Sequence, residues 1–328
     1  MNNNPVITIF GLGRMGSQIA RRLHTKGFKV HAWNRSEEPV KLIQKDGVKA
    51  SNSILEVMNW TSSVENISID KIDGSPSVSH SNSKKQRIFW IMLPHAIVHD
   101  FLFGKTGIAK YLKRGDIVID GGNSFYKLTM KRATKMTKKG IHYFDCGTSG
   151  GVWGEKNGFA LMVGGPKPKW PVIEPYVKAL SSGDNYAYCG TTGAGHFVKM
   201  VHNGIEYGMM EAIAEGYAVL HASQFKLDLA NVTRVYQNGS VVRSWLIDLC
   251  RNIFENEDIA NTSGKIDSNG EGEWTVKTGK ELGVDVRVIE DALKVRSESI
   301  IPKNQKKYSN KIVALMRKQF GGHAVHKK

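Results

Sequence analysis

Four polar side chains between residues 195 and 207 have the types and spacing of an acid–base pair with hydrogen-bonding neighbours. Lys199 and Glu206 are seven residues apart, with His202 and Asn203 between them. In a helix these positions share one face. A lysine loses its proton near neutral pH where desolvation or a nearby cation lowers its pKa. A carboxylic acid roughly 11 Å along the helix would reach the other end of a small ligand. We therefore predict a catalytic base and acid here, with a solvated polar stripe as the alternative.

The helix that carries these side chains is expected to be long and central. Residues 193–223 are apolar at helical spacing and contain no proline. Phe197, Met200, Val201 and Ile205 make the surface beside the polar stripe apolar, so we expect the stripe to face a cavity.

A glycine-rich turn near the start of the chain has the spacing of a dinucleotide-binding loop. Residues 6–10 are expected to form a buried strand and residues 15–26 a helix, with a GxGxxG pattern between them. The first glycine permits the turn, the second lets the backbone approach a pyrophosphate, and the third lets helix and strand pack closely. The helix N-terminus adds free N–H donors. The predicted cofactor-binding residues of this loop are Gly11, Leu12, Gly13, Arg14, Met15 and Gly16.

The residues after the second expected strand, 29–33, bear on the choice of cofactor. Enzymes that use NAD usually have an acidic residue there, which accepts from the ribose 2′-OH. This chain has Asn34, Arg35 and Ser36, and Arg35 and Ser36 are able to bind a 2′-phosphate. We predict NADP. NAD stays open, because Glu37 and Glu38 follow closely and because Arg35 could instead stack on the adenine.

Two later strand ends carry glycines followed by polar side chains, at 117–124 and 144–151. Glycines let backbone amides reach a ligand, and Asn and Ser side chains supply hydrogen bonds. Ligands of open α/β sheets bind beyond the carboxyl ends of the strands, so both loops are predicted to belong to the site. Ordinary turn chemistry is the alternative. The predicted cofactor contacts also include Leu93 and Asn123.

These loops need a sheet whose strands end along one edge. Short apolar runs alternate with amphipathic stretches in the first half of the chain, and helical stretches alone follow residue 190. We predict an α/β Rossmann-type doubly wound parallel sheet in residues 1–188 and an all-α domain for substrate binding and oligomerisation in residues 189–328. The polar segment 61–86 is interpreted as a surface insertion without regular structure, with a binding loop as the alternative. Further strands are expected at 87–93, 116–120, 143–145 and 160–163, and helices at 228–237, 241–255, 274–282, 285–301 and 305–320.

Composition is compatible with two globular domains. The chain has 328 residues, 41% of them hydrophobic, and a net charge of +16. Residues 1–150 have 23 Lys and Arg against 11 Asp and Glu, which suits either a polyanionic ligand or a generally basic surface. No apolar run is long enough for a membrane span, and we expect no secretory signal. Three widely spaced cysteines predict reduced thiols and a cytoplasmic protein.

Several segments together resemble one known family. Residues 11–16, 120–124, 149–151 and 199–207 occur in the order found in 6-phosphogluconate dehydrogenase (decarboxylating), a member of the 3-hydroxyacid dehydrogenase superfamily. The string HNGIEY is more specific than the glycine motifs, because the wider superfamily typically has Asn-Asn after its lysine. Trp274-Thr275 and the sequence 320–323 are similar to further segments of the family, and the length fits its short-chain branch.

This resemblance implies roles for individual residues. Lys199 would take the proton of the 3-hydroxyl of 6-phosphogluconate and then assist loss of CO₂, and Glu206 would protonate the enediol to give ribulose 5-phosphate. It also implies NADP as cofactor, no metal, and a homodimer or homotetramer. In the long forms the residues that correspond to Arg317 and His323 come from a second subunit, and the sequence leaves open whether they do so here. The implied substrate-binding residues are Asn123, Ser149, Gly150, Gly151, His202, Asn203, Tyr207, Arg296, Arg317 and His323.

Some features depart from the family's long forms or leave alternatives. Asn269, Glu271 and Glu273 stand where the long forms have a lysine and a threonine for the phosphate. A 3-hydroxyacid dehydrogenase acting without decarboxylation is the alternative function. The basic first half would also suit nucleic acid, but the sequence has no recognisable reader motif and we expect no such partner. We expect that removal of residues 317–328 leaves a folded protein that still binds the cofactor.

Overall fold

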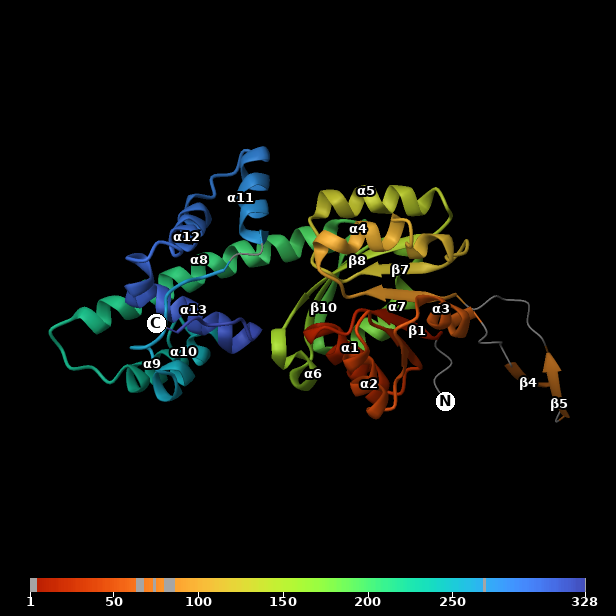
Figure 1. Ribbon diagram of the computed structural model, residues 1–328, viewed down its shortest axis with the longest axis horizontal. Helices are drawn as coiled ribbons and strands as arrows, with labels where there is room; N and C mark the ends of the chain where they lie inside the picture. Colours follow the sequence, from red (N-terminus) through yellow and green to blue (C-terminus); the bar gives the residue numbers. More distant parts are fainter. Residues whose placement is uncertain (1–4, 63–67, 73–74, 80–85, 268–269, 328) are drawn as a thin grey trace. The chain divides into compact units, whose positions relative to one another are not determined.

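The computed structural model describes residues 5–62, 68–72, 75–79, 86–267 and 270–327, and for 68–72 and 75–79 it describes the backbone alone. The chain forms two compact units, residues 1–199 and residues 200–328. Figure 1 shows the first as a sheet with helices on both faces and the second as a group of helices.

The first unit is built on a sheet in which eight strands are described, in the order β10-β9-β8-β7-β6-β1-β2-β3. β1 pairs in parallel with both β2 and β6, so the chain changes direction across the sheet at β1. Ligands of doubly wound sheets bind at such a switch point, beyond the carboxyl ends of the strands. The strands are β1 (Ile7–Phe10), β2 (Val30–Trp33), β3 (Lys49–Ser51), β6 (Ile88–Ile91), β7 (Ile117–Asp120), β8 (His142–Ser149), β9 (Phe159–Gly164) and β10 (Ser181–Gly190).

The predicted doubly wound sheet is confirmed, with one correction to its direction. β9 is antiparallel to β8, and β10 is parallel to β9. The reason is the short connection at 150–158, because a parallel crossover needs a dozen or more residues.

Alternate residues of the central strands pack against helices on opposite faces. Ile7 and Ile9 belong to one buried cluster with residues of α1, α2 and α7, whereas Phe10 packs in a second cluster with residues of α3, α4 and α5. This two-sided burial explains why the strands read as continuous apolar runs. The helices of this unit are α1 (Arg14–Thr25), α2 (Glu37–Lys45), α3 (Ile54–Ser62), α4 (His95–Phe103), α5 (Tyr126–Thr137), α6 (Gly154–Asn157) and α7 (Trp170–Leu180), with short 3₁₀ turns at Ile108–Lys110, Gly151–Trp153 and Lys167–Lys169.

The segment 61–86 differs from its prediction where the structure describes it. It begins inside α3 and contains an antiparallel pair of strands, β4 (Ser68–Ile72) and β5 (Ser75–Ser79). The remaining parts of the predicted insertion, 63–67, 73–74 and 80–85, lie outside the described residues.

The second unit is helical in its described residues, apart from one isolated bridge between Thr262 and Lys327. Its core includes Tyr207, Met210 and Tyr217 of α8 together with apolar residues of α10, α12 and α13. The helices are α8 (Ala194–Ala222), which begins in the first unit, α9 (Leu229–Gln237), α10 (Trp245–Asn256), α11 (Glu271–Glu281), α12 (Arg287–Glu298) and α13 (Tyr308–Gly321), with a 3₁₀ turn at Asn304–Lys306.

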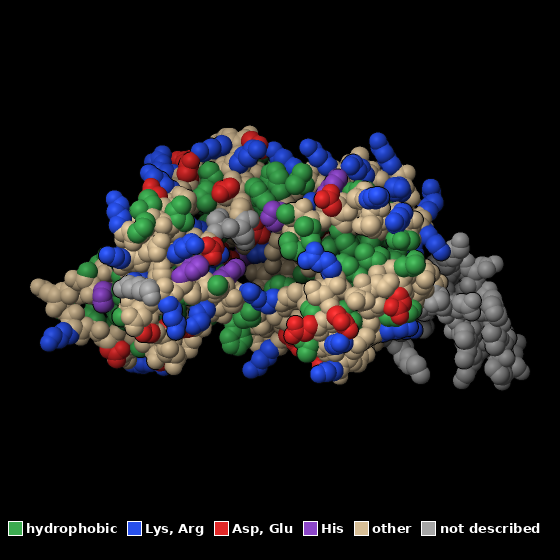
Figure 2. Space-filling model, viewed as in Figure 1, with side chains coloured by type: hydrophobic (Ala, Val, Ile, Leu, Met, Phe, Trp, Pro, Cys, Tyr) green, Lys and Arg blue, Asp and Glu red, His purple; other side chains and the backbone are tan. Residues whose placement is uncertain are grey.

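On the face drawn in Figure 2, Lys and Arg side chains are spread over the surface with Asp and Glu among them. Within the described residues, none of the helices has the length and apolar character needed to cross a membrane.

Candidate active site

The loop after β1 has the shape that a dinucleotide pyrophosphate requires. Gly11 has a φ of 101°, and a Cβ there would lie 2.5 Å from the carbonyl oxygen of Met92. A Cβ on Gly16 would overlap the Gly11 carbonyl. Gly13 has open space where a Cβ would be, and no side chain caps α1 at this position. The loop is therefore closed on the protein side and open beside free N–H groups, which fits a bound phosphate.

Asn34 connects this loop to the end of β2. Its side-chain oxygen accepts from the Leu12 backbone N–H at 3.0 Å, and its amide nitrogen donates to the Ser36 carbonyl at 3.1 Å. Arg35 and Ser36 are exposed beside it. The Glu37 carboxylate forms an ion pair with Lys41 at 2.9 Å, so a neighbouring cation compensates this acidic charge.

The ends of β6, β7 and β8 lie together in the first unit. A Cβ on Gly122 would overlap the Leu93 carbonyl oxygen. The Asn123 side-chain oxygen accepts from the Thr148 backbone N–H at 3.2 Å, and Asn123 adopts a positive φ of 51°. Gly150 and Gly151, with φ values of 125° and 54°, continue this loop from the half-buried Ser149. The structure thus brings together the predicted first-unit residues Leu93, Asn123, Ser149, Gly150 and Gly151.

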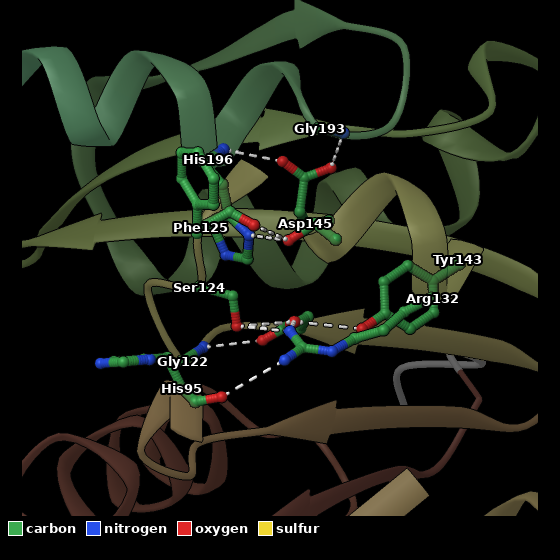
Figure 3. Close-up of polar contacts among 11 residues, drawn as sticks. His95, Gly122, Ser124, Phe125, Arg132, Tyr143, Asp145, Gly193 and His196 are labelled. Atoms are coloured by element: carbon green, nitrogen blue, oxygen red, sulfur yellow. Dashed lines mark hydrogen bonds and ion pairs between the residues drawn. The ribbon is translucent and has the colours of Figure 1, made fainter. Parts of the chain in front are cut away.

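A buried ion pair that the sequence analysis missed fixes the turn carrying Asn123 (Figure 3). One Asp120 carboxylate oxygen accepts from Arg132 at 3.1 Å, from the Ser124 hydroxyl at 3.0 Å and from the Tyr143 hydroxyl at 3.1 Å. Its other oxygen accepts from the Gly122 N–H at 3.2 Å. Burial, with the Asp120 charge second, raises the pKa of Tyr143 well above its usual range, which keeps this hydroxyl a donor.

A second buried carboxylate, Asp145 of β8, fixes the start of α8 (Figure 3). It accepts from the backbone N–H groups of Gly193 at 2.6 Å and His196 at 2.7 Å. Lys199 follows one turn later and is buried, 5% exposed. Lys199 packs closely against β8, because a Cβ added to Gly147 would overlap the Cβ of Lys199. Lys199 therefore lies against the strand that leads to Ser149.

In the second unit, His202, Asn203 and Glu206 contact one another along α8. The His202 Nδ1 is 2.9 Å from the Asn203 side-chain oxygen and 3.8 Å from the Glu206 carboxylate. The Asn203 amide nitrogen donates to the carboxylate of Glu271. Glu271, one of the acidic residues at the position where the long forms bind the phosphate, is thus buried and binds Asn203. Glu273 is exposed, and Asn269 lies outside the described residues.

Two arginines and a tyrosine form a buried cationic group in the same unit. The Arg296 guanidinium carbon lies 3.3 Å from the centre of the Tyr207 ring. Burial lowers the pKa of Arg317, and the Arg296 charge lowers it further, whereas Tyr207, Asp267 and Glu206 raise it. Among the described residues, the Nε and Nη2 atoms of Arg296 have no hydrogen-bond partner. Two buried guanidinium groups, of which Arg296 has unused donors, suit an anion such as a phosphate.

The structure corrects the expectation about the C-terminal tail. Arg317 lies inside α13 and is 6% exposed, and Phe320 and Val325 pack against the core of this unit. Removal of residues 317–328 would open that core, so a folded truncated protein is no longer expected. Arg317 lies near Arg296 of its own chain, so these two cations do not need a second subunit to meet. His323 follows the end of α13, with its ring 6.2 Å from that of Phe320.

Comparison with known proteins agrees with this division of the chain. Residues 6–193 match the family model for the NAD binding domain of 6-phosphogluconate dehydrogenase, and residues 195–327 match the model for its C-terminal domain. The chain belongs to the 6-phosphogluconate dehydrogenase family. Within the described residues there is no group of three or more His, Cys, Asp or Glu that could hold a metal ion.

Two relatives are similar over nearly their whole length. The chain is 36% identical to YqeC of Bacillus subtilis (strain 168), over 98% of this chain and 99% of that protein. It is 33% identical to the NAD(+)-dependent, decarboxylating 6-phosphogluconate dehydrogenase of Haloferax volcanii, over 98% of each.

Solved structures agree with the fold. The 6-phosphogluconate dehydrogenase of Plasmodium falciparum matches with a TM-score of 0.75 and 27% identity, over 90% of this chain and 62% of that one. The 3-hydroxyisobutyrate dehydrogenase of Salmonella typhimurium has a TM-score of 0.71 at 17% identity, over 94% and 99%, which is a likeness of fold alone.

Proposed function

We propose that this chain catalyses the NADP-dependent oxidative decarboxylation of 6-phosphogluconate to ribulose 5-phosphate and CO₂. The observation that carries the proposal is the buried pair of Arg296 and Arg317 beside Tyr207 and Glu206. A phosphorylated sugar acid would supply a dianion to these cations. An unphosphorylated 3-hydroxyacid would offer no phosphate oxygen to the unused Nε and Nη2 donors of Arg296.

In this proposal Lys199 is the base. Lys199 takes the proton of the 3-hydroxyl group. The aliphatic part of the Lys199 side chain is held in place by its contact with β8 at Gly147. The bound nicotinamide supplies the hydride acceptor. The ammonium group of Lys199 then polarises the 3-keto oxygen while the bond to the carboxylate breaks and CO₂ leaves. Glu206 lies two turns along α8 and donates a proton to the carbon that lost CO₂.

The remaining predicted residues are proposed to position the sugar acid. The Asn123 side-chain oxygen accepts a hydrogen bond from the Thr148 backbone N–H, and the Asn123 amide N–H groups are proposed to bind the ligand. Asn203 is oriented by His202 and Glu271. Ser149, Gly150 and Gly151 offer a hydroxyl and backbone N–H groups, and Tyr207, Arg296, Arg317 and His323 are proposed to hold the phosphate.

The proposed preference for NADP depends on the end of β2. Arg35 and Ser36 are exposed there, and the Asn34 side chain that replaces the usual carboxylate is engaged with the loop backbone. A 2′-phosphate would therefore meet a guanidinium and a hydroxyl. The family contains both specificities: the Haloferax relative is NAD(+)-dependent, and a Bacillus subtilis relative that is 30% identical is NADP(+)-dependent.

We also propose a cytoplasmic homodimer or homotetramer that acts in the pentose phosphate pathway. Support for the oligomer comes from large apolar side chains exposed on the helical unit, among them Phe225 at 65% and Val235 at 58%. The free cysteines Cys146, Cys189 and Cys250 are in keeping with a reducing compartment.

The alternative, a 3-hydroxyacid dehydrogenase without decarboxylation, has the likeness of fold in its favour. A comparison of substrates separates the two. Reduction of NADP is measured with 6-phosphogluconate, with gluconate and with 3-hydroxyisobutyrate at equal concentrations. Our proposal predicts a kcat/KM for 6-phosphogluconate at least about 100-fold above the others, since the phosphate contacts are charged hydrogen bonds. A preference for either unphosphorylated acid would favour the alternative.

A further inference from the structure

Glu211 is a buried carboxyl group that the proposed reaction does not use. It lies on α8 one turn beyond Tyr207 and is 5% exposed. Neither of its carboxyl oxygens has a hydrogen-bond partner among the described residues. An ionised carboxylate in such a place is costly unless an opposite charge is near or a proton neutralises it.

The charges around Glu211 come from two helices. Burial raises the pKa of Glu211 to about 7, Arg296 of α12 opposes this shift, and Glu215 of α8 adds to it. Arg296 in turn has Arg317 of α13 near it, and Tyr207, Asp267 and Glu206 act on that second arginine. With a pKa of about 7, Glu211 would change charge near neutral pH, and the charge of Arg296, the cation proposed to bind phosphate, acts on it.

Arg296 and Glu211 interact through their charges without forming a hydrogen bond. The guanidinium lies over the Tyr207 ring, and its Nε and Nη2 atoms have no partner among the described residues, as is also true of the Glu211 oxygens. A carboxylate and a guanidinium that were both ionised and free to move would be expected to pair. The lack of a hydrogen bond between them is what a protonated Glu211 beside a cation that binds another anion would give.

We propose that Glu211 is a proton-linked positioning residue for the phosphate of the substrate. When Glu211 is protonated, the Arg296 guanidinium is available to the phosphate. When Glu211 is ionised, its carboxylate competes with the phosphate for that guanidinium. Binding and protonation are then coupled in both directions, so a phosphate dianion bound near Arg296 favours uptake of a proton by Glu211. This inference rests on the proposed function, because it assigns Arg296 to the phosphate of 6-phosphogluconate.

The test compares the KM for 6-phosphogluconate of the intact wild-type protein and Glu211→Gln between about pH 6.5 and pH 8.5. Glutamine keeps the size of the side chain and removes its charge. We expect the KM of the wild type to rise about ten-fold more over this range than the KM of the variant, with parallel kcat profiles. The substrate's own phosphate, whose second pKa is about 6, affects both proteins alike. Glu255→Gln, which removes an exposed carboxylate of α10 that is not among the charges acting on Glu211, is the control and should follow the wild type.

Parallel KM profiles for wild type and Glu211→Gln would overturn the inference. If Glu211→Gln does not fold, Glu211→Met gives the same comparison. Calorimetry with inorganic phosphate at about pH 7.5, in two buffers of different ionisation enthalpy, tests the coupling without turnover. The wild type should take up more protons than the neutral variant, and equal uptake would contradict the inference. The absence of any turnover of 6-phosphogluconate by the wild type would instead refute the proposed function, while the calorimetry would still decide the role of Glu211.

Discussion

The carboxylate of Asp145 accepts a hydrogen bond from the backbone N–H of His196 at 2.7 Å, which joins strand β8 to the first turn of α8. The same carboxylate accepts from Gly193, so one buried side chain supplies the acceptor that the helix N-terminus needs. Burial raises the pKa of Asp145, and the charge of His196 and these two donors oppose that shift. Lys199 is in the next turn, so its position depends on this contact.

Replacement of Asp145 should therefore affect both stability and turnover. Asp145→Ala leaves two buried N–H groups without acceptors, and we expect a loss of about 2–4 kcal/mol in the free energy of unfolding. Asp145→Asn keeps one acceptor and should lose about half as much. Both variants should have a lower kcat, measured well below their unfolding temperatures. Asp184→Ala, an exposed aspartate on β10, is the control. Unchanged stability of Asp145→Ala in urea would show that the contact contributes little.

Arg35→Ala tests the proposed cofactor preference. A guanidinium that binds a 2′-phosphate contributes about 1.5–3 kcal/mol, so KM for NADP should rise roughly 10- to 100-fold while KM for NAD changes little. Lys45→Ala removes an exposed cation at the end of α2 and should alter neither value. If Arg35→Ala raised both KM values equally, Arg35 would be interacting with the adenine.

Arg317→Ala tests the proposed phosphate site without removing the tail. We expect KM for 6-phosphogluconate to rise by at least about ten-fold, because one charged hydrogen bond is lost, with KM for NADP unchanged. The neighbouring Lys318 forms an ion pair with Glu257 at 2.7 Å, and Lys318→Ala is the matched control. A substrate KM equal to that of the wild type would remove Arg317 from the phosphate site.

The buried Glu211 should also make stability depend on pH. Its pKa is about 7 in the folded chain and 4.5 for the unperturbed group, so the folded protein keeps a proton that the unfolded chain releases in this window. Stability then falls as pH rises from about 4.5 to 7, by at most about 3 kcal/mol. Glu211→Gln should be as stable as the wild type near pH 5 and more stable near pH 8, by urea unfolding. A difference that does not vary with pH would mean that Glu211 keeps one charge state throughout.

Local spacing was enough to predict the loop and helix that carry the candidate chemistry. Gly11 and Gly16 occur where a Cβ would overlap backbone, and α8 begins within one residue of its prediction. These features depend on residues that are close together in the sequence, so one sequence is enough to predict them. The antiparallel β9 was also readable in principle, because the connection at 150–158 is too short for a parallel crossover.

Contacts between distant residues could not be predicted in this way. In the sequence, Arg132 is one of several cations in a basic stretch. Only the packing of α5 against the sheet reveals that Arg132 is buried and bound to Asp120. Glu211 likewise reads as one polar residue of a long helix until α12 brings Arg296 near it. β10 was missed because most of its residues are polar or small and many are exposed. Its sequence therefore lacks the apolar pattern that is typical of a strand.

The most direct test of the proposed reaction measures the products of the wild-type protein and compares the wild type with Lys199→Ala. Purified protein is incubated with 6-phosphogluconate and NADP, and reduced cofactor, CO₂ and ribulose 5-phosphate are quantified together. We predict the three products in equal amounts from the wild type. We also predict that kcat falls by at least about 1,000-fold in Lys199→Ala while NADP binding is retained. Reduced cofactor without CO₂, or a Lys199→Ala protein that keeps more than a few per cent of kcat, would contradict the proposed reaction.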